Sequence, residues 1–206
     1  MLVVYGRGTS SNVQKVLWLV EEIGLPYSSS HVVPPGKAKE SADYKKLNPN
    51  GLIPTIDEDG FVLWESNAIV RYLAAKHAYG TIFPADLRVR ADSDRWMDWQ
   101  ATVLAPPVAT VLLQVVRTPP EKRDTAAMTA AFQTNREKAA VLDAALSGRD
   151  YLAGSAFTMG DIAVGQWMWR YANLVPDRPS HPNLEAWYQR LQARPAYRKV
   201  VMNPLE

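Results

Sequence analysis

A change of pattern near residue 80 constrains the fold of this 206-residue chain more than any other feature. Before it, short apolar runs alternate with helical spacings and are bounded by glycine or proline. After it, apolar residues recur only at the intervals of amphipathic helices. The length allows two small domains. We therefore expect an α/β domain over residues 1–78, a linker over about 79–87 and an all-helical domain over 88–206.

The first domain is expected to follow the order βαβαββα. Leu2–Tyr5 is a continuous apolar run that ends at Gly6, which suits a strand covered on both faces. A helix and then a strand at Tyr27–Val33 complete a βαβ unit with a right-handed connection. Asp57–Gly60 is a polar loop between two β-rich runs, which indicates a hairpin. The expected elements are strands at 2–5, 27–33, 53–56 and 61–64, and helices from 13, over 41–47 and from 66.

The second domain is expected to contain only helices. Its first helix is long, and Pro106-Pro107 should kink it, because proline removes a helix hydrogen bond and clashes with the preceding turn. Thr158 and Asp161 have the spacing of a capping box, and Phe157 and Ile162 occupy the positions of a hydrophobic staple around it. This motif predicts a stability element. The expected helices run through Trp96–Val115, Met128–Leu146, Thr158–Arg170 and Leu184–Leu191.

Composition and charge exclude several classes of function. The chain has no cysteine, which rules out disulfides, thiolate metal sites, iron–sulfur clusters and a cysteine nucleophile. The net charge of +2 gives no reason to expect nucleic acid or an anionic membrane as a partner. The histidines are scattered and no metal-binding motif is present, so no metal is expected. No stretch approaches the ~20 apolar residues of a membrane span, and a cytoplasmic location is expected.

Motifs at separated places along the chain carry a family resemblance. They are the loop Thr9–Asn12, the turn Asn48–Pro54, the stretch Glu65–Leu73 and the stretch Phe157–Ala163. In this order and spacing, the chain resembles the cytosolic glutathione S-transferases, in a serine-type, bacterial-like subgroup. The resemblance covers nearly the whole chain. It implies a thioredoxin-like first domain, a helical-bundle second domain, glutathione as co-substrate and a homodimer.

The resemblance implies which residues bind glutathione. Ile53-Pro54 would be joined by a cis peptide and would present its backbone to the ligand as an added strand does. Ser66, at a helix start with free N–H groups, would take the γ-glutamyl carboxylate, and Glu65 would take the ammonium. Lys39, or failing it Lys37, would lie near the glycine carboxylate. The residues alone equally allow a structural turn, a helix cap preceded by a surface acid, and solvated lysines.

The resemblance also implies the group that serves the glutathione sulfur. In the serine classes a serine in the loop after the first strand holds that position, and Ser10 falls on it, with Ser11 and Asn12 beside it. A hydroxyl that donates a hydrogen bond to the thiolate favours the charged form. Ser10 and Ser11 are also residues that cap a helix. Tyr5 is the rival, since other classes use an early tyrosine, but it lies inside the apolar strand run.

The second substrate would bind between the domains. The resemblance assigns its pocket to the first loop, the long helix and the C-terminal segment, where the candidates are Trp99, Val103 and Pro106, with Trp167 or Trp169. Tryptophans at helical spacing are also typical core residues. The expected activity is conjugation of the glutathione thiolate to small hydrophobic electrophiles. The alternatives are glutathione-dependent reduction of peroxides or disulfides, and a non-catalytic binding or interaction protein on the same fold.

Overall fold

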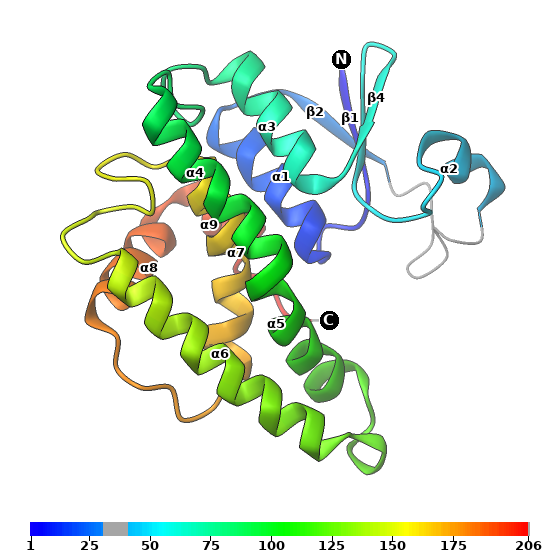
Figure 1. Cartoon of the computed structure of the whole chain (residues 1–206). Helices are drawn as coiled ribbons and strands as arrows, with labels where there is room; N and C mark the ends of the chain where they lie inside the picture. The colour runs from blue at the N-terminus through cyan, green and yellow to red at the C-terminus, as the bar shows by residue number, and fades with distance from the viewer. Residues whose placement is uncertain (31–40, 206) are drawn as a thin grey trace.

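The computed structural model of the chain describes residues 1–30 and 41–205. A layer of strands and helices from the first part of the chain lies beside a bundle of helices from the rest (Figure 1). The expected βαβαββα order is confirmed. The elements of the first part are β1 (Leu2–Tyr5), α1 (Ser11–Glu22), β2 (Tyr27–Ser30), α2 (Ala42–Leu47), β3 (Thr55–Glu58), β4 (Phe61–Trp64) and α3 (Ser66–His77).

The strands form one mixed sheet of order β2-β1-β3-β4. β1 pairs in parallel with β2 and antiparallel with β3, which follows from the helical crossover between the first two strands. β3 and β4 form the expected hairpin. The described part of the second strand ends at Ser30, so the end of the expected strand Tyr27–Val33 lies outside the described residues, as do Lys37 and Lys39.

In its described residues, the second part holds only helices, as expected. Its long helix runs from Leu87 to Arg117, and Pro106-Pro107 do not end it. A π-helical turn, Gln100–Leu104, lies shortly before the prolines, which lack the N–H groups of a regular helix, and the kink itself stays a prediction. The elements are α4 (Leu87–Trp99), the π turn Gln100–Leu104, α5 (Ala105–Leu112), a second π turn Leu113–Arg117, a short 3-10 helix Pro120–Lys122, α6 (Thr125–Ala145), α7 (Met159–Leu174), α8 (Pro182–Ala193) and α9 (Pro195–Val200).

The long helix Leu87–Arg117 is long and apolar enough, by length and composition alone, to cross a membrane. The expectation that no stretch approaches a membrane span was therefore wrong for this helix. Its first half carries charged residues such as Asp92 and Arg95, which a bilayer core accepts only at high cost. Its α4 and α5 segments pack on α7 and α6, where Leu104 and Val108 are buried. Its most apolar stretch is 28% buried in the structure, so these packing contacts cover only part of its apolar surface.

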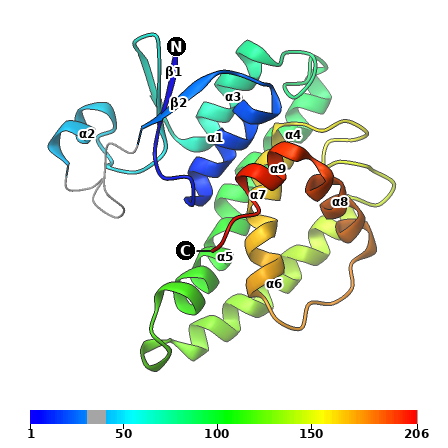
Figure 2. The ribbon, with the colours of Figure 1, turned by 180° about the vertical axis from the view of Figure 1, so that it is seen from behind.

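Both halves of the molecule pack on α1. Every residue from Val13 to Val20 is buried, because α1 contacts α3 as well as α7 and α9. Figures 1 and 2 show this arrangement from opposite sides. The centroid of the Trp18 ring lies 5.5 Å from that of Phe157 and 4.7 Å from that of Tyr197. Gly165 on α7 leaves room for this contact, since a Cβ there would meet the Trp18 ring at 3.2 Å.

The expected capping box at the start of α7 is present and deeply buried. The carboxylate of Asp161 accepts hydrogen bonds from the backbone N–H groups of Thr158 and Leu152, each at 2.9 Å. It also accepts from the Thr158 hydroxyl at 3.1 Å and from the indole N–H of Trp187 at 2.9 Å. Burial raises the pKa of Asp161, and these hydrogen bonds act in the opposite direction. This one carboxylate therefore joins α7, α8 and the loop between α6 and α7.

Replacing Asp161 with Ala is expected to lower the free energy of unfolding by about 3 kcal/mol or more. Hydrogen bonds to a charged group contribute ~1.5–3 kcal/mol each, and their buried donors would be left without an acceptor. The melting temperature, followed by circular dichroism, should fall by about 6 °C or more. The exposed Asp177→Asn is the control and should melt like the parent. An unchanged melt for Asp161→Ala would contradict the assignment.

Candidate functional site

A cavity of about 580 Å³ lies between the two parts of the molecule, at the starts of α1 and α3 and the junction of α4 with α5. Its lining combines mostly polar residues of the first part with Trp167 of α7 and with residues of the long helix, which are Asp98, Gln100, three alanines and Pro106. Of the residues predicted from the sequence, Asn12, Glu65, Ser66, Pro106 and Trp167 line it. The structure thus brings together members of the predicted ligand sites from four separate elements.

The start of α3 has an unusual backbone. Glu65, the N-cap residue, has φ 73°, a left-handed conformation that costs a non-glycine residue roughly 1–3 kcal/mol. Its side chain is exposed and makes no capping hydrogen bond to the helix, while Ser66 is buried in the first turn. Because the Glu65 side chain does not cap the helix, N–H groups at this end remain available to an anion.

The turn before β3 is fixed by side chains around it. The peptide bond between Ile53 and Pro54 is cis, as expected. The carbonyl oxygen of Leu52 accepts hydrogen bonds from the side-chain amide of Asn48 at 2.7 Å and from the hydroxyl of Tyr44 at 2.8 Å. Neither Ile53 nor Pro54 lines the cavity, so the structure leaves their role in binding as a prediction.

The loop after β1 leads directly into α1. Ser10 is the N-cap of α1, but its side chain makes no capping hydrogen bond. Ser11 is the first helical residue, and Asn12 is exposed and lines the cavity. The helix-cap interpretation of Ser10 therefore holds for its backbone but not for its hydroxyl. Tyr5, the rival candidate, lies within β1, with its ring centroid 6.5 Å from that of Tyr44.

A buried arginine that the sequence did not reveal holds this loop. Arg170, on α7, donates hydrogen bonds to the backbone carbonyl of Thr9 and to the side-chain oxygen of Gln14, each at 3.1 Å. The Gln166 side chain donates to the same Gln14 oxygen at 2.9 Å. Burial, and then the charge of Arg117, lower the pKa of Arg170 to about 10, so it stays a cation at neutral pH. Arg170 and Thr9 are 161 positions apart, so no local sequence pattern predicts this contact.

A second buried cation, Lys15 of α1, lines the cavity. Its ammonium donates hydrogen bonds to Asn67 Oδ1 at 2.7 Å and to Gln100 Oε1 at 3.0 Å. Asn67 donates in turn to the carbonyl of Met97 at 2.8 Å, so these contacts join α1, α3 and α4. Burial lowers the pKa of Lys15 to about 7, although the charge of Glu65 acts to raise it. From the sequence alone, Lys15 would be taken for a surface lysine on an amphipathic helix.

The predicted electrophile residues are divided by the structure. Pro106 and Trp167 line the cavity, whereas Trp99 and Val103 do not. Trp99 packs edge-to-face on the buried Trp96, with ring centroids 5.2 Å apart. Val103 lies within the π turn Gln100–Leu104, between α4 and α5. The role of Trp99 and Val103 in binding an electrophile stays a prediction.

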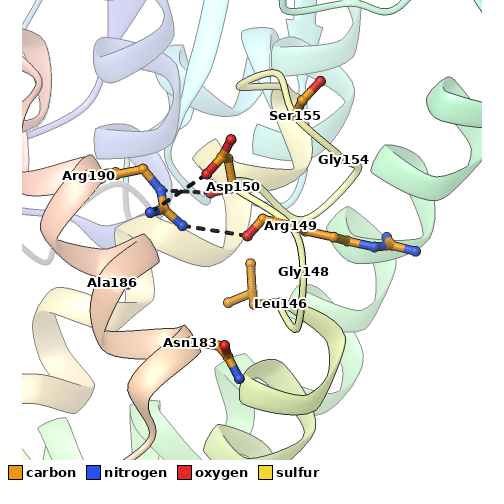
Figure 3. A pocket seen from close by; sticks show the side chains of 9 residues that line it. All are labelled: Leu146, Gly148, Arg149, Asp150, Gly154, Ser155, Asn183, Ala186 and Arg190. Carbon is orange, nitrogen blue, oxygen red and sulfur yellow. Dashed lines mark hydrogen bonds and ion pairs between the residues drawn. The ribbon is translucent and has the colours of Figure 1, made fainter.

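Another cavity, of about 410 Å³, lies between the loop after α6 and α8 (Figure 3). Its Arg190 donates hydrogen bonds to the carbonyl oxygens of Asp150 and Arg149, at 3.0 and 3.5 Å, and lies 3.8 Å from the Asp150 carboxylate. None of the catalytic or ligand-binding residues predicted from the sequence lines it. Within residues 1–30 and 41–205, no group of three or more His, Cys, Asp or Glu side chains could hold a metal ion.

Comparisons with known proteins cover both parts of the chain. The family models described as "Glutathione S-transferase, N-terminal domain" and "Glutathione S-transferase, C-terminal domain" match residues 9–76 and 104–195. The chain is 41% identical to glutathione S-transferase GstB of Escherichia coli strain K12, over 100% of both proteins. It is 31% identical to glutathione S-transferase 3 of Zea mays, over 97% of this chain and 93% of the relative.

A solved structure agrees with these matches. The theta class glutathione S-transferase from Xanthomonas axonopodis pv. citri, with glutathione bound, has a TM-score of 0.94 to this structure at 43% identity. The match covers 100% of this chain and 99% of that one.

Removing the contacts of Arg170 is expected to loosen the loop Thr9–Asn12. In Arg170→Met, amide hydrogen exchange in that loop should rise about tenfold or more, because the Thr9 carbonyl loses its side-chain partner on α7. Exchange in α8 should not change. Arg198→Met, an exposed arginine of α9, is the matched control. Equal loop protection in both variants would show that Arg170 does not position the loop.

Proposed function

The chain belongs to the glutathione S-transferase family, and from this premise we propose that it binds glutathione at the start of α3 and conjugates its thiolate to small hydrophobic electrophiles. One observation carries the proposal: a single cavity joins Asn12 of the first loop and the uncapped start of α3 to Pro106 and Trp167. A charged peptide and an apolar second substrate would thus find adjoining surfaces. The domain boundaries 1–78 and 88–206 belong to the same proposal.

Each end of glutathione has a partner in this proposal. The γ-glutamyl carboxylate binds at Ser66 and the N–H groups of the first turn of α3, and its ammonium pairs with the exposed Glu65. The backbone of Ile53, beside the cis Pro54, pairs with the peptide as an added strand does. Lys39 takes the glycine carboxylate.

The sulfur is served by the loop after β1. A free thiol has pKa ~8.5, so only ~3% is thiolate at pH 7. A hydrogen bond from Ser10, with Ser11 and Asn12 beside it, that lowered this pKa by about two units would raise the thiolate ~25-fold. Intrinsic nucleophilicity would fall ~6–10-fold, so the net gain is only ~3–4-fold. Most of the acceleration therefore comes from holding thiolate and electrophile together.

The electrophile binds on the other side of the sulfur, against Pro106 and Trp167. The small side chains of Ala101, Ala105 and Ala109 complete this surface. Small and apolar residues suit aryl or alkyl compounds better than charged ones. The protein acts here by positioning and by excluding water, with no covalent step on its own side chains.

Three assays and one titration test the proposal. Glutathione binding is measured by calorimetry, and turnover is measured with an aryl halide, an organic hydroperoxide and a mixed disulfide. Ser10→Ala is expected to lower kcat/KM with the aryl halide about three- to fourfold while glutathione still binds, since that is the net gain from the hydroxyl's effect on the thiolate. Asn12→Ala and Ser11→Ala should have smaller effects.

Ser28→Ala, an exposed serine on β2, is the control and should keep full activity. If Ser10→Ala keeps full activity while Ser11→Ala or Asn12→Ala is inactive, the residue that donates to the glutathione sulfur is Ser11 or Asn12 and not Ser10. Activity only with the hydroperoxide or the disulfide would replace conjugation by reduction. If glutathione does not bind at millimolar concentration, the proposed activity is wrong and only the assignment of the fold stands.

We also propose that the protein is a cytoplasmic homodimer. The edge strand β4 exposes the large apolar side chains Phe61 and Trp64, one on each face of the sheet, and Trp64 is the candidate contact between two copies. Light scattering should give twice the chain mass of 23.0 kDa. Trp64→Glu is expected to shift the mass toward the monomer, whereas a monomeric parent protein at micromolar concentration would contradict the dimer.

A further inference from the structure

Lys15 is a buried cation without a counter-ion in the described part of the chain. Its side chain is 2% exposed, and no carboxylate of residues 1–30 and 41–205 forms an ion pair with it. Its two hydrogen-bond partners, Asn67 and Gln100, are neutral amides. An ammonium has three N–H donors, so one is left for a further partner. Burying such a charge is costly, and an apolar residue of the same length would avoid the cost.

The position of Lys15 indicates which kind of group accepts its third hydrogen bond. It lines the cavity, and its hydrogen bond to Asn67 places the ammonium against the first turn of α3, directly after Ser66. The N–H groups of this turn and the ammonium are all donors and all favour negative charge, so an anion is the partner that suits both best. Arg170, the cation on the α7 side of α1, contacts Gln14 and Thr9 instead.

The charged groups around Lys15 come from α3 and α4. Glu65 acts to raise the pKa of Lys15, and Arg71 acts to lower it. Arg71 is itself bonded to Asp94 at 2.5 Å and to Asp98 at 2.6 Å, so its charge is largely balanced. Burial is the largest effect, and it leaves the pKa of Lys15 at about 7. Without a ligand, burial therefore disfavours the charged form of Lys15.

We propose that Lys15 binds the γ-glutamyl carboxylate of glutathione, completing with Ser66 and the start of α3 an anion site that takes up a proton when it is filled. This inference rests on the proposed function. The bound carboxylate supplies the counter-ion that the free protein lacks, and it therefore holds the ammonium in its charged form. Lys15 is in this sense a ligand-binding residue, and it contributes nothing to the thiol itself.

Proton uptake on binding is expected only within a defined range of pH. A bound carboxylate raises the pKa of Lys15 above its value of about 7 in the free protein. Below that value Lys15 is charged before and after binding, and no proton is taken up. Above it, binding must first charge the amine, so affinity falls as pH rises until the pKa of the complex is reached.

Calorimetry with S-methylglutathione, whose sulfur cannot ionise, measures this uptake. Titrations at pH 6 and pH 8, each in two buffers of different ionisation enthalpy, give the number of protons bound. The wild-type protein is expected to take up almost none at pH 6 and a large fraction of one at pH 8. Its affinity should fall several-fold, up to about tenfold, between the two.

Two substitutions distinguish the contribution of the Lys15 charge to affinity from the uptake of a proton on binding. Lys15→Met is expected to bind about tenfold or more weakly at pH 6 and to lose the proton uptake that Lys15 provides. Lys15→Arg stays charged at both pH values, since arginine has a pKa above ~12, and it should bind without proton uptake. Lys122→Met removes an exposed lysine far from the cavity and should behave like the parent. Circular dichroism confirms that each variant is folded.

The possible failures are distinguishable. Equal affinity and equal proton uptake in the parent and Lys15→Met would overturn the inference and leave the proposed function standing, because the ligand still binds. Uptake that persists in Lys15→Arg would assign the proton to the ligand amine or to Glu65, and would also overturn it. If Lys15→Met does not fold, the parent and Lys15→Arg still decide. A parent protein that does not bind S-methylglutathione or glutathione contradicts the proposed function itself.

Discussion

The contact of α1 with both halves of the molecule is what the rest of the structure depends on. Trp18 packs between Phe157 and Tyr197, and one side-chain oxygen, that of Gln14, accepts from two groups on α7. Because the loop Thr9–Asn12 is the start of this helix, its position is set by the helical part as much as by the sheet. The first loop of this chain therefore needs both parts of the molecule to hold its position.

Much of the fold could be predicted because it follows from local periodicity. The apolar run Leu2–Tyr5, the hairpin around Asp57–Gly60 and the capping box of Asp161 each depend on residues close in sequence. The Glu65-Ser66 corner was found through the order and spacing of family motifs, since a serine at a helix start has an ordinary explanation as a cap. Its strained backbone and its place in the cavity needed the structure.

The parts that could not be predicted are long-range or depend on an irregular turn. Arg170 and Lys15 are typical surface residue types, and only tertiary packing decides that they are buried. Their partners lie on other helices, so no spacing reveals them. Trp99 and Val103 were assigned from the family resemblance, and neither lines the cavity that Pro106 lines. Val103 lies inside the π turn Gln100–Leu104, an irregularity that no spacing in the sequence predicts.

That π turn, Gln100–Leu104, has a consequence for how the scaffold diversifies. A π turn holds one residue more than an α turn, so deleting one position there would restore a regular helix and leave α5 close to its present orientation. Pro106 and Ala109 would keep their places in the cavity, and the change would be confined to the turn itself, which contributes Gln100 and Ala101 to the lining. A deletion at this turn would thus reshape the cavity wall locally while both halves of the long helix stay packed as they are.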